Sequence, residues 1–294
     1  MLLKLVKKMS VFPIINGIIL LLLSMLCILP IMHIIAISFS SSIAVETGKV
    51  GFIPYDFTLS AYEFIAQRIE FWRAMYVTIQ RVIIGGGISM LLTVLTAYPL
   101  SKEDSYLKGR NIFAWVFFIT MLVGGGLIPW YMLIKQLNLM DTLWALVLPG
   151  AVQVFNIVIL LNFFRQLPKA LEEAAVIDGA SHFIILFKIY IPSAMPALAT
   201  LTLFTLVGHW NSWFDGLILM NFPEKYPLQT YLQTMIIAKD FSLMTGYNVQ
   251  SMGEISSKTV QAAQIFLGAL PVMLFYPFLQ KYFVKGIVLG SVKG

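Results

Sequence analysis

Charged residues are scarce in this sequence. Asp, Glu, Lys and Arg make up 12% of its 294 residues, whereas a soluble domain of ordinary composition carries about 25%. Hydrophobic residues make up 59%, and the mean hydropathy is +0.85. This balance excludes an ordinary soluble domain and predicts a protein that lies largely within a membrane.

Cysteine and histidine are almost absent as well. The single cysteine, Cys27, cannot form a disulfide within the chain, and His33, His182 and His209 are too few and too scattered for a metal cluster. We therefore expect no metal site and no bound cofactor.

Signatures of nucleotide binding and catalysis are also missing. The sequence has no G-x-x-x-x-G-K-[S/T] phosphate loop, so the chain does not bind ATP by that route. Its glycine clusters at 85–87 and 124–126 lack the lysine and lie in apolar runs, where we interpret them as packing or kink positions. Neither H-E-x-x-H nor G-x-S-x-G occurs, which argues against an intramembrane protease. We expect no catalytic residue and no enzymatic activity in this chain.

Long apolar runs are what the sequence has in abundance. Crossing a bilayer takes a helix of roughly 20 apolar residues, and these runs are too long and too uniform for barrel strands. The first run follows basic residues, as in a signal peptide, but its apolar stretch is too long and no cleavage site closes it. We expect one all-α, polytopic membrane domain over 1–294, with an uncleaved first helix. Six predicted transmembrane helices lie at about 13–39, 72–99, 112–134, 143–164, 197–221 and 260–283.

The distribution of charge predicts the orientation. With both termini in the cytoplasm, the inner segments hold 12 basic and 5 acidic residues, and the rest of the chain holds 8 basic and 9 acidic residues. Positive residues favour the cytoplasmic side, so we predict that both termini are cytoplasmic. The pI near 9.3 follows from this asymmetry, and we expect no nucleic-acid partner.

Polar and helix-breaking residues interrupt the second and third runs. Arg81 lies in the second run, where it either pairs or reaches the interface, or else lines a polar path. The small residues at 85–87 allow close approach of another helix. The cluster at 124–126 with Pro129 predicts a break in the third run, and the neighbouring Trp130 suits the membrane interface.

The most polar of the predicted cytoplasmic segments is 165–195. It reads as a helix, a tight turn at Asp178-Gly179 and a second helix that Ser181 can cap. A polar helical hairpin of this kind is either a docking surface for a partner or a solvated loop.

One motif in this segment resembles the EAA signature of ABC importer permeases, the binding-protein-dependent family. Its residues are Glu173, Ala174, Ala175, Asp178, Gly179 and Ala180, with Ile189 and Pro192 at matching positions downstream. The resemblance covers essentially the whole chain and implies a type I ABC importer permease-like fold with a cytoplasmic EAA helix hairpin. In such importers the hairpin docks on a separate ATPase, so the six motif residues are implied as ATPase-coupling contacts, and Glu173 as an ion-pair partner.

The outer segments narrow the resemblance. Residues 124–152 and 209–232 are similar to the carbohydrate-uptake branch, and closest within it to the LplC- and YtcP-like oligosaccharide permeases. This implies a subunit of the bacterial cytoplasmic membrane that translocates a carbohydrate into the cell. It also implies a second homologous permease, two ATPase subunits and an extracellular sugar-binding protein as partners. A homodimer in place of the permease heterodimer stays open.

A carbohydrate is commonly held by aromatic faces and hydrogen-bonding side chains, and the fifth run ends in such residues. An acid at membrane depth, such as Asp215, is costly unless it faces a cavity or a partner. The alternative is an interfacial aromatic belt with a structural pairing at Asp215. Asn156 and Asn162 in the fourth run are weaker candidates, since either can simply bond across helices. The cargo-path candidates are His209, Trp210, Asn211, Trp213, Asp215 and Asn156.

A secondary transporter of a small polar solute is the alternative function. It would need coupling-ion residues near the midplane and usually an internal repeat. Apart from Asp215, acidic residues are nearly absent from the apolar runs, and no clear repeat is found. We therefore favour ATP-driven import.

Overall fold

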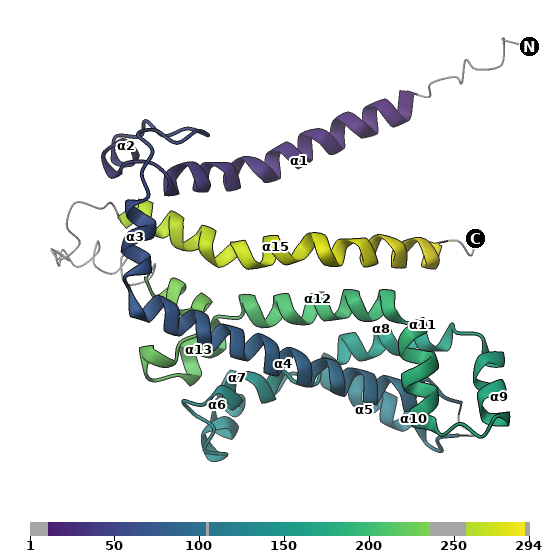
Figure 1. Cartoon of the computed structure of the whole chain (residues 1–294). Helices are drawn as coiled ribbons and strands as arrows, with labels where there is room; N and C mark the ends of the chain where they lie inside the picture. The colour runs from purple at the N-terminus through teal and green to yellow at the C-terminus, as the bar shows by residue number, and fades with distance from the viewer. Residues whose placement is uncertain (1–10, 104–105, 236–256, 292–294) are drawn as a thin grey trace, which may run out of the picture. The chain divides into compact units, whose positions relative to one another are not determined.

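The structure is a computed structural model that describes residues 11–103, 106–235 and 257–291. The described residues are helical apart from their connections and one isolated bridge between Ser40 and Phe57 (Figure 1). The predicted all-α class is confirmed for this part of the chain. The chain forms two compact units, namely Met1–Arg68 with Ile236–Ala269, and Ile69–Met235 with Leu270–Gly294.

The first unit combines one long apolar helix with short helices. Its helices are α1 (Val11–Ser38), α2 (Ser42–Glu46), α3 (Ser60–Ala66) and the first part of α15 (Ser257–Ser291). Phe39 stacks on Phe57 and Tyr62, with ring centroids 5.5 and 4.8 Å away, and meets Phe266 of α15 edge to face. Apolar side chains are exposed along most of α1, which is the surface that a membrane-spanning helix presents to lipid.

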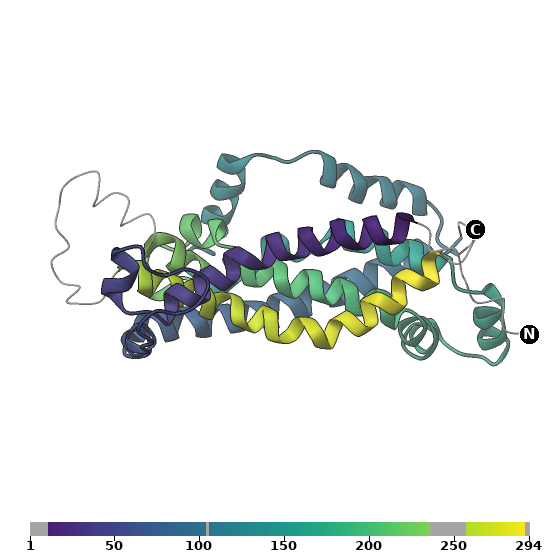
Figure 2. The ribbon, with the colours of Figure 1, turned by 90° about the horizontal axis from the view of Figure 1, so that it is seen from above.

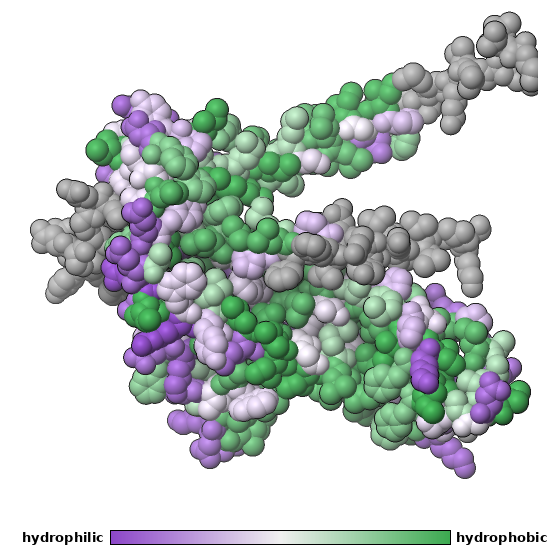
Figure 3. Space-filling model, in the orientation of Figure 1, coloured by the Kyte–Doolittle hydropathy of each residue, from purple (hydrophilic) through white to green (hydrophobic). Residues whose placement is uncertain are grey.

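The second unit is built around the 33-residue helix α4 (Ile69–Ser101). This helix packs against both α8 (Val154–Arg165) and α12 (Met195–Asn211), and α12 lies beside it in Figures 1 and 2. Apolar residues cover much of the visible face of this unit (Figure 3). Other elements of the unit are α5 (Arg110–Leu122), α6 (Leu127–Gln136), α7 (Leu143–Val147), η1 (Leu148–Gly150), α9 (Lys169–Ile177), α10 (His182–Ile185), the π-helical turn η2 (Leu186–Tyr190), α11 (Ile191–Ser193), α13 (Phe214–Leu219) and η3 (Pro223–Lys225).

Two glycines allow α12 to approach α4 closely. A methyl group added at Gly85 would lie 2.8 Å from Cε1 of His209, and one added at Gly86 would lie 2.7 Å from Cδ2 of Leu206. Both distances are too short for a real contact, so a side chain at either position would force His209 or Leu206 of α12 to shift. The predicted packing role of the cluster is confirmed at these two positions, whereas Gly87 faces open space.

The apolar helices overlap the predicted spans but are more often broken. Two described helices, Phe12–Ser38 and Ile69–Ser101, are alone long and apolar enough to cross a bilayer. Three helix pairs pass the same test together, each with a bend at its break, so these helices account for up to five spans. The pairs are Arg110–Leu122 with Leu127–Gln136 (111°), Leu143–Gly150 with Val154–Arg165 (45°), and His182–Ser193 with Met195–Asn211 (83°). The sixth predicted span lies within α15, and the total of six stays a prediction.

One of these breaks was predicted, and a further break, between α12 and α13, was not. The third run breaks at the glycine cluster, where Gly126 has a φ of 83°, as expected. The fifth run was predicted to be continuous over 197–221, but α12 ends at Asn211 and α13 begins at Phe214. The reason is local: Asp215 accepts hydrogen bonds at the break, so polar side chains replace the helical bonds there.

Candidate functional site

Two regions of the second unit bring polar residues together, and the first is the hairpin of α9 and α10. Gly179 follows α9 with a φ of 76°, a left-handed conformation that suits glycine. Its amide donates to the carbonyl of Val176 at 3.0 Å, and the amide of Ala180 donates to that of Ala175 at 2.9 Å. These are the two bonds of a Schellman C-cap, so the predicted helix, turn and helix are present.

The face of this hairpin that points away from the unit is apolar as well as polar. Within the EAA motif, the exposed residues are Glu173, Ala174, Asp178 and Gly179, and the half-buried residues that pack against the core are Ala175 and Ala180. The adjoining Ile177 and Phe183 are 85% and 69% exposed. Exposed apolar side chains gathered on one surface are typical of a protein interface.

A buried ion pair joins α9 to the residue that follows α4. The Nζ atom of Lys102 lies 2.6 Å from Oε1 of Glu172, and the hydroxyl of Tyr190 donates to Oε2 of Glu172 at 2.6 Å. The same Nζ lies 4.2 and 4.0 Å from the ring centroids of Tyr98 and Tyr190, which is cation–π geometry. We refer to these four residues as the Lys102 cluster. Lys102 is only 7% exposed, so its ammonium is held by this cluster and not by water.

Burial and hydrogen bonding act against each other on the pair. Burial alone would raise the pKa of Glu172, but the hydrogen bonds from Lys102 and Tyr190 and the positive charge of Lys102 outweigh it and lower that pKa. Burial lowers the pKa of Lys102, and the contact with Glu172 opposes this shift only in part. The carboxylate is therefore held in its charged form, while the ammonium loses hydration.

The sequence drew attention to Glu173, and the anchored carboxylate is its neighbour Glu172. The available signal was spacing, because Glu172 lies three residues before Ala175 and so shares its face of the helix. Ala175 packs against the core.

A second ion pair joins the same two segments at the surface. Lys169 contacts Glu103, and the two side chains are 75% and 60% exposed. Exposed pairs contribute little to stability. This pair therefore differs from Lys102–Glu172 chiefly in burial.

The second region is a cavity at the break between α12 and α13. It has a volume of about 330 Å³ and is bordered by α4, α6, α7 and the segment between η1 and α8. Its polar and aromatic lining consists of Arg81, Trp130, Gln153, His209, Ser212 and Asp215.

Arg81 provides the charge in this cavity and is 3% exposed. It forms a two-pronged ion pair with Asp215, in which Nη1 lies 3.1 Å from Oδ1 and Nη2 contacts Oδ2. The carboxylate also accepts from the hydroxyl of Ser212 and the amide of Gly216, both at 2.9 Å. The Nε atom of Arg81 is buried without a hydrogen-bond partner among the described residues. The sequence offered pairing and a place on a polar path as alternatives for Arg81. In the structure Arg81 both pairs with Asp215 and borders a polar cavity.

Of the remaining cargo-path candidates, one lines the cavity and four do not. His209 lines the cavity beside Arg81 and lies 3.5 Å from the hydroxyl of Ser89. Asn156 lies outside the lining and donates to Oγ1 of Thr205 at 3.0 Å, which is a bond between α8 and α12. Trp210 lines a separate apolar groove formed with α4 and α15. Asn211 and Trp213, like Asn162 of the fourth run, are exposed and do not line the cavity.

Besides Arg81, three polar or aromatic lining residues were not among the cargo-path candidates, namely Trp130, Gln153 and Ser212. Trp130 was interpreted as an interface anchor, and nothing marked Gln153 or Ser212. All three flank helix breaks, since Trp130 follows Gly126, Gln153 precedes α8 and Ser212 follows α12. A search for polar residues beside predicted breaks would have found them.

Comparison with known proteins gives consistent relatives. A family model described as "Binding-protein-dependent transport system inner membrane component" matches residues 107–288. "Polygalacturonan/rhamnogalacturonan transport system permease protein YtcP" of Bacillus subtilis (strain 168) is 40% identical over 278 residues, covering 94% of this chain and 96% of the relative. "Protein LplC" of the same organism is 40% identical over 267 residues, covering 91% of this chain and 90% of that protein.

A solved structure is similar over nearly the whole chain. It is the crystal structure of a bacterial ABC transporter involved in the import of the acidic polysaccharide alginate. The matched chain is 35% identical, with a TM-score of 0.83, and the match covers 93% of this chain and 96% of that one.

Proposed function

The chain belongs to the family of binding-protein-dependent transport system inner membrane components, and from this we propose that it is the permease subunit of an ATP-driven importer for an oligosaccharide. Family membership removes the alternative of a secondary transporter. The cargo class is supported by the relatives, because YtcP is named for polygalacturonan and rhamnogalacturonan transport and the solved importer acts on alginate. The match over nearly the full length of these proteins is the observation that carries the proposal.

The chain itself would supply the path and not the energy. ATP hydrolysis would take place on two separate ATPase subunits, and an extracellular sugar-binding protein would deliver the cargo to this chain and a second permease. The proposed topology is a single multi-pass domain over 1–294 in the bacterial cytoplasmic membrane, with six spans and both termini inside.

The exposed face of the α9–α10 hairpin is the proposed ATPase contact. Glu173, Ala174 and Asp178 are exposed there beside Ile177 and Phe183. The small residues permit close approach of another backbone, and the apolar ones gain by leaving water. Glu173 is the proposed partner for a basic residue of the ATPase.

The cavity is the proposed part of the cargo path that this chain contributes. Its volume of about 330 Å³ lies near the lower end of the range of roughly 300–1,000 Å³ for ligand sites. Arg81 is paired with Asp215, so the pair presents little net charge to a sugar. The Nε atom of Arg81 is buried without a partner among the described residues, so it would donate to a sugar oxygen only after the side chain moves. The ring of Trp130 offers an apolar face, and a second permease would complete the enclosure.

Purification of the tagged chain from its own membranes in mild detergent would test the assembly, with mass spectrometry of the proteins that accompany it. We expect an ATPase and a second permease. Reconstituted vesicles with an added sugar-binding protein should accumulate oligogalacturonides or alginate oligosaccharides only when ATP is present. Accumulation driven by an ion gradient without ATP would overturn the proposal.

Substitution of Trp130 tests the cavity separately. Trp130→Ala should raise the half-saturating sugar concentration about fivefold, as expected for the loss of an aromatic contact that contributes about 1 kcal/mol. Trp144→Ala is the matched control, because Trp144 is 46% exposed and does not line the cavity. Equal effects of the two substitutions would exclude the cavity as a cargo contact.

A further inference from the structure

One helix connects the two regions of the site. Arg81 of α4 borders the cavity, and Lys102 directly follows the last residue of the same helix. At a rise of about 1.5 Å per residue the two lie about 30 Å apart along the helix, which is close to the thickness of a bilayer core. A movement of the helix end at Lys102 would therefore also move Arg81 at the cavity.

Side chains of neighbouring helices contact the end of α4. Pro99 lacks an amide hydrogen, so the helical bond to the carbonyl of Leu95 cannot form. At the end of the helix, Arg165 of α8 donates to the carbonyl of Leu100 at 3.2 Å and Arg110 of α5 donates to that of Lys102 at 2.6 Å. Side-chain contacts therefore set the position of this helix end.

Helix α9, in turn, has few attachments to the unit, whereas α10 buries Ile185 in the core and places Nδ1 of His182 3.3 Å from the hydroxyl of Tyr98. None of the residues of α9 is fully buried. Ala175 packs half-buried against the core, and Glu172 reaches inward to Lys102 and Tyr190. Glu172 thus provides the main polar attachment of α9 to α4.

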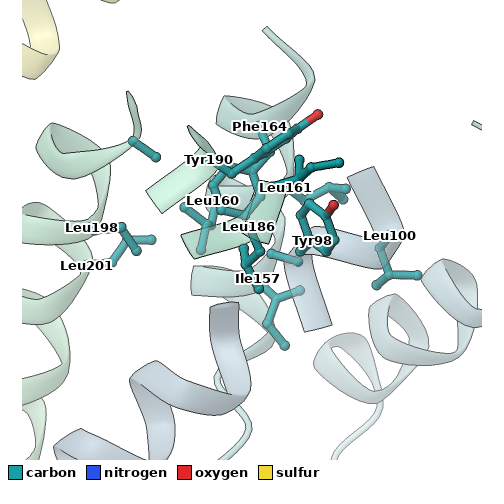
Figure 4. Packing of buried hydrophobic residues seen from close by; sticks show 13 residues of the cluster. Tyr98, Leu100, Ile157, Leu160, Leu161, Phe164, Leu186, Tyr190, Leu198 and Leu201 are labelled. Atoms are coloured by element: carbon teal, nitrogen blue, oxygen red, sulfur yellow. The ribbon is translucent and has the colours of Figure 1, made fainter. Parts of the chain in front are cut away.

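Tyr190, which donates to Glu172, also packs against α4 and α8. Its ring lies 5.1 Å from that of Tyr98 of α4 and 5.3 Å from that of Phe164 of α8, edge to face in both cases. Figure 4 shows Tyr98, Phe164 and Tyr190 in the core cluster at this end of the unit. Tyr190 ends the π-helical turn η2, a distortion that often occurs at functional positions. Lys102 is therefore enclosed by rings and by a carboxylate from three different elements.

We propose that Lys102 is a positioning residue that transmits movement of the α9–α10 hairpin to α4 and so to the cavity. The inference rests on the proposed function, in which an ATPase moves the hairpin. A buried pair with cation–π contacts on two rings fixes the distance between α9 and α4, whereas the exposed pair Lys169–Glu103 is screened by water.

A purely structural role makes a different prediction. If the Lys102 cluster only stabilised the fold, its loss would reduce the amount of assembled importer but leave the transport per ATP of each assembled complex unchanged. Transmission requires the opposite pattern, with ATP hydrolysis retained and less sugar moved for each ATP.

The experiment compares three variants in the purified complex reconstituted into vesicles with the sugar-binding protein. Lys102→Met keeps the length of the side chain and removes the charge, and it should lower the sugar accumulated per ATP hydrolysed about tenfold, within the range of couplings between sites. Lys102→Arg keeps the charge and can stack on both rings, so it should restore most of the ratio. Lys169→Met, the matched control at the exposed pair, should leave the ratio unchanged. An unchanged ratio in Lys102→Met would overturn the proposal.

Two further measurements keep the outcome decisive. If Lys102→Met does not assemble, Tyr190→Phe replaces it as the test. This substitution removes only the hydrogen bond to Glu172 and should lower the sugar accumulated per ATP by a smaller factor. An unchanged ratio in Tyr190→Phe would count against transmission. If the wild type moves no sugar, the proposed function fails, and spin labels at the exposed residues Leu171 of α9 and Leu91 of α4 then test the connection alone. The distribution of distances between the two labels should stay narrow when nucleotide is added to the wild-type complex and should broaden in Lys102→Met. A narrow distribution in both proteins would overturn the proposal.

Discussion

Two buried ion pairs of the same kind, one within α4 and one directly after it, lie in different surroundings. Arg81–Asp215 borders an open cavity, and one guanidinium nitrogen is buried there without a partner among the described residues. Lys102–Glu172 is enclosed by Tyr98 and Tyr190. The first pair has a cavity beside it, and the second is surrounded by aromatic rings. On the proposals above, burial of a charge would serve a ligand in the first case and a mechanical connection in the second.

Removal of the carboxylate should have the largest effect at the cavity end. Asp215→Ala leaves the guanidinium of Arg81 buried without its partner, and loss of one member of a buried pair costs about 3–5 kcal/mol. We expect a large fall in the thermal midpoint of the detergent-solubilised chain and a large loss of assembled complex.

An exposed pair on the same helix provides the control. Arg73 of α4 lies 4.0 Å from Glu224, and their side chains are 51% and 78% exposed. Glu224→Ala should change the midpoint little, since exposed pairs contribute about 0–1 kcal/mol. Similar midpoints for the two variants would mean that Arg81 gains access to water and that burial does not decide the comparison.

The next largest effect concerns the wall of the cavity. In Gly85→Ala the new methyl group would lie 2.8 Å from Cε1 of His209, and overpacking of this kind costs about 1–3 kcal/mol. We expect reduced stability and weaker transport, because the ring of His209 must shift within the cavity wall. Gly87→Ala is the matched control, since a methyl group there meets no atom within 4 Å, and it should be tolerated. Equal tolerance of both would show that α12 can move away at no cost.

The comparison also shows what the sequence could predict. The helical class followed from the apolar runs, and the hairpin turn followed from Asp178-Gly179, because both depend on local chemistry. The two pairings did not follow, since Arg81 and Asp215 are 134 residues apart and Lys102 and Glu172 are 70 residues apart. Partners at such separations are chosen by the packing of helices, which the sequence of one chain does not display.

The details that the structure arranges differently have the same origin. A charge in an apolar run marked Arg81 as unusual, and pairing was one alternative for Arg81 and for Asp215. The sequence did not indicate that the two residues pair with each other. Aromatic and amide residues at 210–213 suggested cargo contacts by their type. The structure places Trp210 on a different groove and brings Gln153 to the cavity instead. Residue type identified the region, and the direction of each helix break decided which side chains enter it.

A smaller effect is expected at the turn of the hairpin. Gly179 has a φ of 76°, and a residue with a Cβ in the left-handed region costs roughly 1–2 kcal/mol. Gly179→Val should therefore distort the turn and remove cargo-stimulated ATP hydrolysis while leaving the cavity end of α4 intact. Gly179→Asn is the control, because asparagine adopts this conformation more readily, and it should retain most of the stimulation. Normal transport by Gly179→Val would separate the hairpin from coupling.

The smallest effect is the dependence of the Lys102 cluster on pH. The pKa of Glu172 is lowered in the folded chain, since the contacts with Lys102 and Tyr190 outweigh burial. A lowered carboxyl pKa contributes stability that is complete above its unfolded value of about 4.3 and is lost as the pH falls through the folded value. The thermal midpoint should therefore fall as the pH is lowered through and below the unfolded value of about 4.3, and Glu172→Gln should reduce that slope while lowering the midpoint at neutral pH. Glu103→Gln tests whether burial matters, because the pKa of Glu103 is also lowered, by its hydrogen bond with Lys169, although the carboxylate is exposed. This variant should reduce the slope less than Glu172→Gln does, since water screens the exposed pair, and an equal or larger reduction would place the acid-sensitive connection at the surface pair.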